Sequence, residues 1–201
     1  MRLGLRFRRF VWRWLDRPGP PPGITIDDAG ELYERGMELN RQGQPQKALE
    51  IARELNGYKY TGAWEVEAVA LHEIGDANGA IEALRNGIEK KPVWRVGHLL
   101  GIYLSDGGRY EEALEAFDAS LGMLHPEPMM TRYNQAITHD RADRTDQAVE
   151  LLRNVVSSES SSEEQQAIEL ATAFLAKLTA NGPNKPTPRR HSFKRPTRRR
   201  R

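Results

Sequence analysis

Small and turn-forming residues recur along the middle of this chain at a regular interval. Alanines at Ala48, Ala80, Ala113 and Ala148 are separated by 32, 33 and 35 residues. Five residues before each lies a turn former, at Gly43, Gly75, Gly108 and Asp143. Twelve residues before each lies a residue with little side chain, at Gly36, Ala68, Gly101 and Ala136. Small residues on both sides of a turn let two helices cross at close range, so the pattern predicts four consecutive helical hairpins.

The second copy carries the fullest set of apolar and turn positions, which are Trp64, Ala68, Leu71, Gly75, Ala80, Leu84 and Pro92. This arrangement resembles the tetratricopeptide repeat family. The resemblance covers residues 29–156, with repeats near 29–60, 61–93, 94–128 and 129–156. It implies an all-α solenoid of about four helix-turn-helix repeats within a repeat domain at 24–182. The fourth copy departs most, because Arg132, His139 and Asp143 replace an aromatic residue, an apolar residue and the turn glycine.

One more helix is predicted after the fourth repeat, at 163–180. Its apolar residues fall on one face, and they are Ala167, Ile168, Ala171, Phe174, Leu175 and Leu178. Ser162 and Gln165 have the spacing of a capping box. A solenoid leaves an apolar face open at its last repeat, so we expect this helix to cover that face as a cap.

The family resemblance also implies a ligand groove, because the first helix of each repeat lines the concave surface in such solenoids. We predict that twelve exposed positions form it: Tyr33, Met37, Asn40, Glu65, Val69, His72, Arg95, His98, Ile102, Tyr133, Ile137 and Asp140. Aromatic and aliphatic residues at such positions suit the anchoring of a peptide or helix. An alternative is that some of them pack between repeats, or that the chain's own arm fills the groove. The family's carboxylate clamp for chaperone tails is not expected, because only Arg95 suits it.

Composition narrows the function further. The chain of 201 residues contains no cysteine, which excludes thiolate nucleophiles and zinc-thiolate sites. No run of eighteen apolar residues occurs, and no signal for secretion, so we expect a cytoplasmic protein that can be peripheral at a membrane, with organelle targeting left open. The five histidines are scattered, and no phosphate-binding loop or nucleophile motif occurs. The sequence therefore predicts no enzyme, cofactor, metal site or small-molecule substrate.

Charge is distributed unevenly along the chain, and the net charge of +2 conceals this. Residues 1–17 carry six arginines and one acid, and residues 183–201 carry nine lysines and arginines and no acid. The body at 18–182 is left with a net charge of −12. The sequence therefore describes an acidic solenoid with a basic arm at each end.

The N-terminal arm at 1–23 is predicted to be an amphipathic helix followed by a Pro/Gly linker. On a helical wheel Leu3, Phe7, Phe10, Val11, Trp14 and Leu15 fall within an arc of roughly 140°, and Arg2, Arg6, Arg9, Arg13 and Arg17 fall within a separate arc of roughly 80°. We expect docking through Phe7, Phe10, Val11 and Trp14, with Arg6, Arg9 and Arg13. An anionic membrane surface suits this composition. Packing on the solenoid or on a protein partner is the main alternative, and an organelle presequence is the third.

The C-terminal arm at 183–201 has only Phe193 as an apolar residue, so its composition predicts a disordered basic tail. It ends in Arg198, Arg199, Arg200 and Arg201, which would contact polyanions such as nucleic acid without sequence specificity.

The sequence taken as a whole predicts a protein-protein interaction adaptor of the tetratricopeptide type. Its groove would bind a peptide or helix of an unidentified protein partner, and its N-terminal helix would dock it on a membrane surface or a larger assembly. The alternative is a structural protein associated with nucleic acid or acidic lipid through the basic arms.

Overall fold

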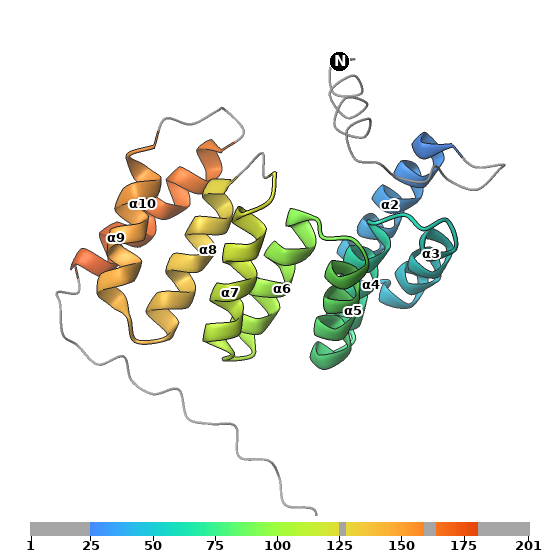
Figure 1. Ribbon diagram of the computed structural model, residues 1–201, viewed down its shortest axis with the longest axis horizontal. Coiled ribbons are helices and arrows are strands. Elements are labelled where there is room, and N and C mark those ends of the chain that lie inside the picture. Colours follow the sequence, from blue (N-terminus) through green and yellow to red (C-terminus); the bar gives the residue numbers. More distant parts are fainter. Residues whose placement is uncertain (1–24, 125–127, 159–163, 181–201) are drawn as a thin grey trace, which may run out of the picture.

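The computed structural model describes residues 25–124, 128–158 and 164–180, and all regular structure in these residues is helical. With the labels of Figure 1, the first helices of the four repeats are α2 (Ile26–Arg41), α4 (Ala63–Glu73), α6 (Trp94–Asp106) and α8 (Pro128–Arg141). The second helices are α3 (Pro45–Gly57), α5 (Ala77–Lys90), α7 (Tyr110–Leu121) and α9 (Thr145–Val156), and α10 (Gln165–Ala180) follows them. The helices form a curved row, with α2 and α3 at one end and α9 and α10 at the other (Figure 1). The predicted all-α solenoid of four helical hairpins is confirmed.

The turns between the two helices of each repeat share one backbone conformation. Gly43, Gly75 and Gly108 have φ values of 67°, 87° and 76°, and Asp143 has a φ of 60°. Glycine adopts this left-handed region without a steric penalty, and aspartate is among the few other residues that tolerate it. The replacement of glycine in the fourth repeat therefore leaves the turn unchanged.

The small residues that define the repeat lie where helices approach most closely. Ala48, Ala80, Ala113 and Ala148 are fully buried. A Cβ atom added to Gly101 would lie 2.5 Å from Cε1 of Phe117, and one added to Gly36 would lie 2.7 Å from Cγ1 of Val66. These distances are too short for non-bonded atoms, so a larger residue at either position would force the neighbouring side chain to move, which agrees with the close helix approach that the pattern predicted.

Side-chain caps begin two of the helices. Thr25 accepts a hydrogen bond from the N–H of Asp28 (3.1 Å), and the Asp28 carboxylate accepts one from the N–H of Thr25 (2.8 Å). This capping box satisfies N–H groups that have no partner within the helix. It starts α2 at Ile26, a few residues before the repeat pattern begins. Asp76 caps α5 in a similar way by accepting from the N–H of Gly79 (2.9 Å).

Helix α10 packs against α8 and α9, as expected for a cap. Ala167 and Ala171 of α10 are buried in a cluster with Met129, Leu152 and Val155. Just before the helix, Glu164 accepts a hydrogen bond from the N–H of Met129 (3.2 Å), which connects the starts of α10 and α8. The predicted capping box cannot be assessed, because Ser162 lies outside the described residues.

The two sets of helices lie on opposite sides of the solenoid. Each first helix contacts the next first helix, from α2 through α4, α6 and α8, and α8 contacts α10. Among the described residues, no second helix contacts the next second helix. First helices that touch while second helices spread apart place the first helices on the inner, concave side of the curve.

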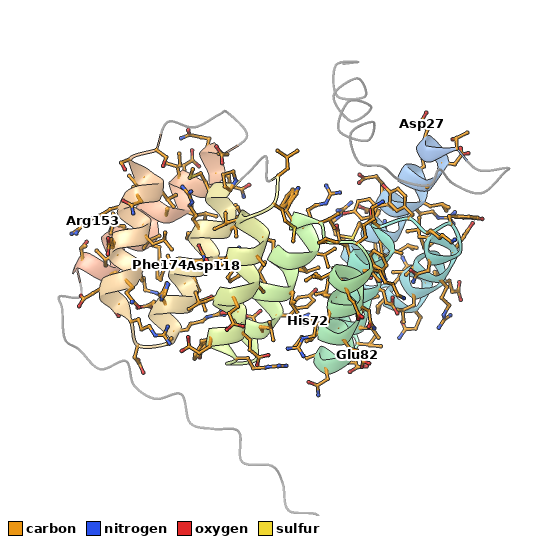
Figure 2. The ribbon with its side chains drawn as sticks, in the orientation of Figure 1. Asp27, His72, Glu82, Asp118, Arg153 and Phe174 are labelled. Atoms are coloured by element: carbon orange, nitrogen blue, oxygen red, sulfur yellow. The ribbon has the colours of Figure 1, made fainter. Side chains whose placement is uncertain are left out.

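The buried core is interrupted between the third and fourth repeats. Buried apolar residues of α4 to α7 form one cluster and those of α8 to α10 form another. Polar contacts connect these blocks: Thr138 with Ser105 (2.9 Å), Gln135 with Asp118 (2.7 Å), Arg141 with Asp106 (2.5 Å) and Arg144 with Glu111. Figure 2 labels Asp118 on the side of α7 that faces α8. We call this set of contacts the polar seam.

Candidate functional site

A buried carboxylate connects the first three repeats on the inner side. Glu65 of α4 is only 5% exposed. One of its oxygens accepts a hydrogen bond from the hydroxyl of Tyr33 in α2 (2.6 Å), and the other accepts one from Nε of Arg95 in α6 (3.2 Å). A buried carboxylate is tolerated when its oxygens are paired in this way. Three of the predicted groove residues, one from each of the first three repeats, therefore form a single hydrogen-bonded unit.

This unit changes the acidity of its members. Burial raises the pKa of the Tyr33 phenol well above its ordinary value, and the neighbouring Glu65 carboxylate raises it further. Burial acts to lower the pKa of Arg95, but Glu65 and Tyr33 outweigh it and the net shift is upward. The hydrogen bond from Tyr33 and the positive charge of Arg95 are thus both retained at any pH near neutrality.

Aromatic rings lie beside the Arg95 guanidinium. Its Cζ atom lies 5.6 Å from the centre of the Trp94 ring and 6.0 Å from the centre of the Tyr33 ring. Tyr60 lies 6.2 Å from Tyr33, centre to centre. Half of the Arg95 side chain is exposed, whereas Trp94 is partly buried. Sequence reasoning identified Trp94 only as the start of a repeat, although a tryptophan next to an arginine is a typical composition for binding hot spots.

His98 connects the third repeat to the fourth. Its Nδ1 lies 2.7 Å from Oγ1 of Thr131, and its Nε2 lies 3.4 Å from Nδ2 of Asn134. The ring also meets Phe117 edge-on, with centres 5.9 Å apart. Thr131 and Asn134, both on α8, were not anticipated from the sequence, because their role depends on how α8 is aligned beside α6.

Predicted groove residues nearer the turns also contact neighbouring helices. Nδ2 of Asn40 donates a hydrogen bond to the carbonyl of Val66 (3.1 Å). The exposed ring of His72, labelled in Figure 2, stacks on Tyr103 with centres 4.4 Å apart and an interplanar angle of 5°. Asp140 accepts a hydrogen bond from Thr145 (3.0 Å). In the fourth repeat, Tyr133 meets Phe174 of α10 edge-on at 6.3 Å.

The prediction that all twelve groove positions are exposed is wrong for two of them. Asn40 is 4% exposed and Glu65 is 5% exposed. Adjacent first helices lie close enough for a polar side chain on one to bond to the other, which removes these two from the surface. They hold the repeats together, and their contact with a ligand is not supported.

Four of the twelve positions form an aliphatic row on the inner side. Met37, Val69, Ile102 and Ile137 occupy equivalent places on α2, α4, α6 and α8, and all four are partly exposed. Each lies one helical turn from the residues that connect the repeats, so each projects to the same side of its helix. We call this row the aliphatic stripe. Residues that are bonded between repeats, such as Tyr33 with Glu65 and His98 with Thr131, lie within about two turns of it, and Met37 and Ile102 also pack against the buried core.

The remaining predicted sites lie outside the described residues. These are the docking residues of the N-terminal arm and Arg198 to Arg201 of the tail. Within residues 25–124, 128–158 and 164–180 there is no group of three or more His, Asp or Glu side chains that could hold a metal ion. None of the helices in this described part combines the length and apolar character needed to cross a membrane.

No protein-family model matches the sequence, and no curated protein matches it. Similarity is found with solved structures. One is the Podosopora anserina kinesin light chain structure with nearly identical TPR-like repeats, at a TM-score of 0.54 and 18% identity, over 73% of this chain and 94% of the other. Another is MamA from Desulfovibrio magneticus RS-1, at a TM-score of 0.53 and 16% identity, over 78% of this chain and 98% of the other.

A third is YrrB, described as a TPR protein with an unusual peptide-binding site, at a TM-score of 0.55 and 17% identity, over 73% of each chain. Sequence identities this low establish similarity of fold alone. The repeat length, the shared geometry of the four turns and these structural neighbours agree with one another. The chain has the fold of tetratricopeptide-repeat proteins.

Proposed function

We propose that this protein is an interaction scaffold whose inner face binds a peptide or helix of a partner protein. The observation that carries the proposal is the aliphatic stripe of Met37, Val69, Ile102 and Ile137, which is partly exposed on four successive first helices. Partly exposed aliphatic side chains aligned at equivalent places on successive helices are typical of a docking site. The proposal includes no catalytic step.

The aromatic and arginine group at one edge of the stripe supports the same function. Arg95 is held between Trp94 and Tyr33 and is bonded to the buried Glu65. Side chains fixed in this way lose little conformational freedom when a ligand binds, which favours affinity. The peptide-binding site of YrrB is consistent with a binding role for this fold.

The proposal is tested by comparing the proteins that co-purify with three versions of the full chain. We expect Val69→Glu with Ile137→Glu to lose a partner that the unchanged protein retains, because charge is placed within the stripe. Asn86→Glu is the matched control, since Asn86 is exposed on α5, a second helix. Identical sets of bound proteins for all three versions would contradict the proposal.

We also propose that the N-terminal arm places the protein at an anionic membrane surface. The support is its sequence, in which an arc of Phe7, Phe10, Val11 and Trp14 is separate from the arginines. Phe10→Asp with Trp14→Asp should abolish flotation of the full chain with anionic vesicles. Unchanged flotation would exclude insertion of this arc, and loss of flotation on addition of nucleic acid would favour the arginines as the contact.

A further inference from the structure

The chemistry around the aliphatic stripe favours a helical ligand over an extended one. An extended peptide needs partners for its backbone N–H and C=O groups, whereas a helix satisfies these groups internally. The polar side chains beside the stripe are already bonded between repeats, as Tyr33 is to Glu65 and His98 is to Thr131. Between these bonded groups the inner face offers a ligand the aliphatic side chains of the stripe, which suit the apolar side of an amphipathic helix.

The spacing of the stripe further specifies such a helix. Packed neighbouring helices lie roughly 8–10 Å apart, so the stripe presents an aliphatic side chain at about that interval. Residues seven apart on an α-helix share a face and are separated by about 10.5 Å. A helix laid across the first helices therefore needs apolar residues at i and i+7. The N-terminal arm contains three such pairs, Leu3 with Phe10, Leu5 with Trp12 and Phe7 with Trp14, and the first and third lie on its apolar arc.

We propose that residues 2–17 occupy the aliphatic stripe of their own chain as a helix when no membrane or partner is bound. This inference rests on the proposed function of the stripe. The seven residues at 18–24, which are rich in proline, connect this segment to Thr25, the cap of α2. At about 3.1 Å per residue in polyproline II geometry they reach roughly 22 Å. Met37 lies about 18 Å along α2 from Thr25, so the linker reaches the first residue of the stripe.

The length of the segment also agrees with the length of the stripe. A helix of residues 2–17 is about 24 Å long, and three intervals of roughly 8–10 Å separate Met37 from Ile137. With residue 17 near Met37, the helix would run toward the fourth repeat. Its arginines fall outside the apolar arc, so they would lie toward the edges of the groove. Glu73, Asp106 and Asp140 each follow a residue of the stripe by about one helical turn. Asp106 is paired with Arg141, so Glu73 is the exposed acid nearest to the middle of the stripe that could meet these arginines.

Such an arrangement makes the groove self-inhibited. A partner helix must displace residues 2–17, and its apparent affinity falls by the fraction of molecules in which the segment is seated. The same apolar arc that would enter a membrane is covered in this state. Docking at a membrane and opening of the groove would therefore be coupled.

Because the chain contains no cysteine, a pair of introduced cysteines can be cross-linked without competing reactions at other thiols, and this tests the proposal. The full chain carrying Val11→Cys and Val69→Cys is treated with a short bismaleimide at low protein concentration, and cross-linked peptides are measured by mass spectrometry. The matched control carries Val11→Cys and Asn86→Cys, which places the second cysteine on the outer side of the same repeat. We expect the Val69 pair to react at least tenfold faster than the Asn86 pair. Equal rates would overturn the proposal.

Two further measurements complete the test. Adding Phe10→Asp and Trp14→Asp to the variant with the Val11–Val69 cysteine pair should lower its cross-linking rate to that of the Asn86 pair. The two aspartates place charge in the apolar arc that would contact the stripe. Links between two chains instead of within one would overturn the proposal, since the occupant would then come from a second copy. Circular dichroism of each variant verifies that the repeats remain folded. Failure of this test leaves the proposed partner-binding function standing, because the co-purification experiment measures binding of a partner protein and not the position of residues 2–17.

Discussion

The hydroxyl of Tyr33 donates a hydrogen bond of 2.6 Å to the carboxylate of Glu65, which lies in the next repeat. The acceptor is almost completely buried, so water cannot replace the donor if it is lost. A single phenol oxygen therefore contributes to the alignment of the first two repeats and of Arg95, which shares the same carboxylate.

Replacing Tyr33 with Phe should destabilise the fold by about 1–3 kcal/mol, because it leaves a buried charged acceptor with one partner fewer. Urea denaturation measures the change. Tyr58→Phe is the matched control, since the Tyr58 hydroxyl donates to Glu54 over 3.3 Å on the surface, and its loss should change stability by less than about 0.5 kcal/mol. Equal effects of the two substitutions would show that Glu65 is solvated.

Gly108→Ala should destabilise by about 1 kcal/mol because of backbone conformation alone. A Cβ atom at Gly108 would meet no neighbour within 4 Å, but its φ of 76° disfavours any L side chain. Gly57 also has open space around it and lies at the end of α3, without a positive φ. Gly57→Ala should therefore be neutral or stabilising by up to about 1 kcal/mol. Urea denaturation measures the free energy of unfolding of both variants, and Gly108→Ala should be the less stable of the two.

Gly101→Ala should destabilise by about 1–3 kcal/mol, because the added methyl group enters the space of the Phe117 ring. Phe117→Leu alone should also destabilise, since it leaves a cavity. The double variant should lose less stability than the sum of the two single variants, because the smaller side chain makes room for the methyl group. Additive losses would show that the two residues do not meet at the helix crossing.

Stability should fall between about pH 10 and pH 12 through Tyr103. Burial, together with Glu73 and Asp106, raises the pKa of Tyr103 to about 12, above its ordinary value of 10.0. A group whose pKa is raised in the folded state stabilises the fold below its unfolded pKa, and this contribution is lost as pH rises toward the folded value. The expected loss is on the order of 2 kcal/mol. Urea melts of Tyr103→Phe across this range should show a smaller fall than those of the unchanged chain, and parallel curves would contradict the assignment.

The repeat could be predicted from the sequence because its defining residues act locally. Gly75 and Gly108 are required by the φ of their own turns, and Gly101 by one close crossing. The fourth repeat is more regular than its sequence indicated, because Asp143 replaces the turn glycine and still adopts a similar positive φ.

The inner face was less predictable, because its contacts depend on how successive first helices align. Glu65 has the pattern of an exposed carboxylate, and only the approach of Tyr33 from α2 and of Arg95 from α6 buries it. Asn40 is buried for a similar reason, by its hydrogen bond to Val66. A sequence pattern gives the face on which a residue lies, but it does not give the distance to the neighbouring helix.

The polar seam has a consequence for the shape of the groove. Apolar contacts tolerate small rotations of one helix against another, whereas hydrogen bonds fix both distance and direction. The bonds of Thr138 to Ser105 and of Arg141 to Asp106 therefore set the angle at which α8 lies against α6. That angle fixes where Ile137 stands relative to Ile102, so polar contacts between α6 and α8 determine the curvature of the last third of the stripe.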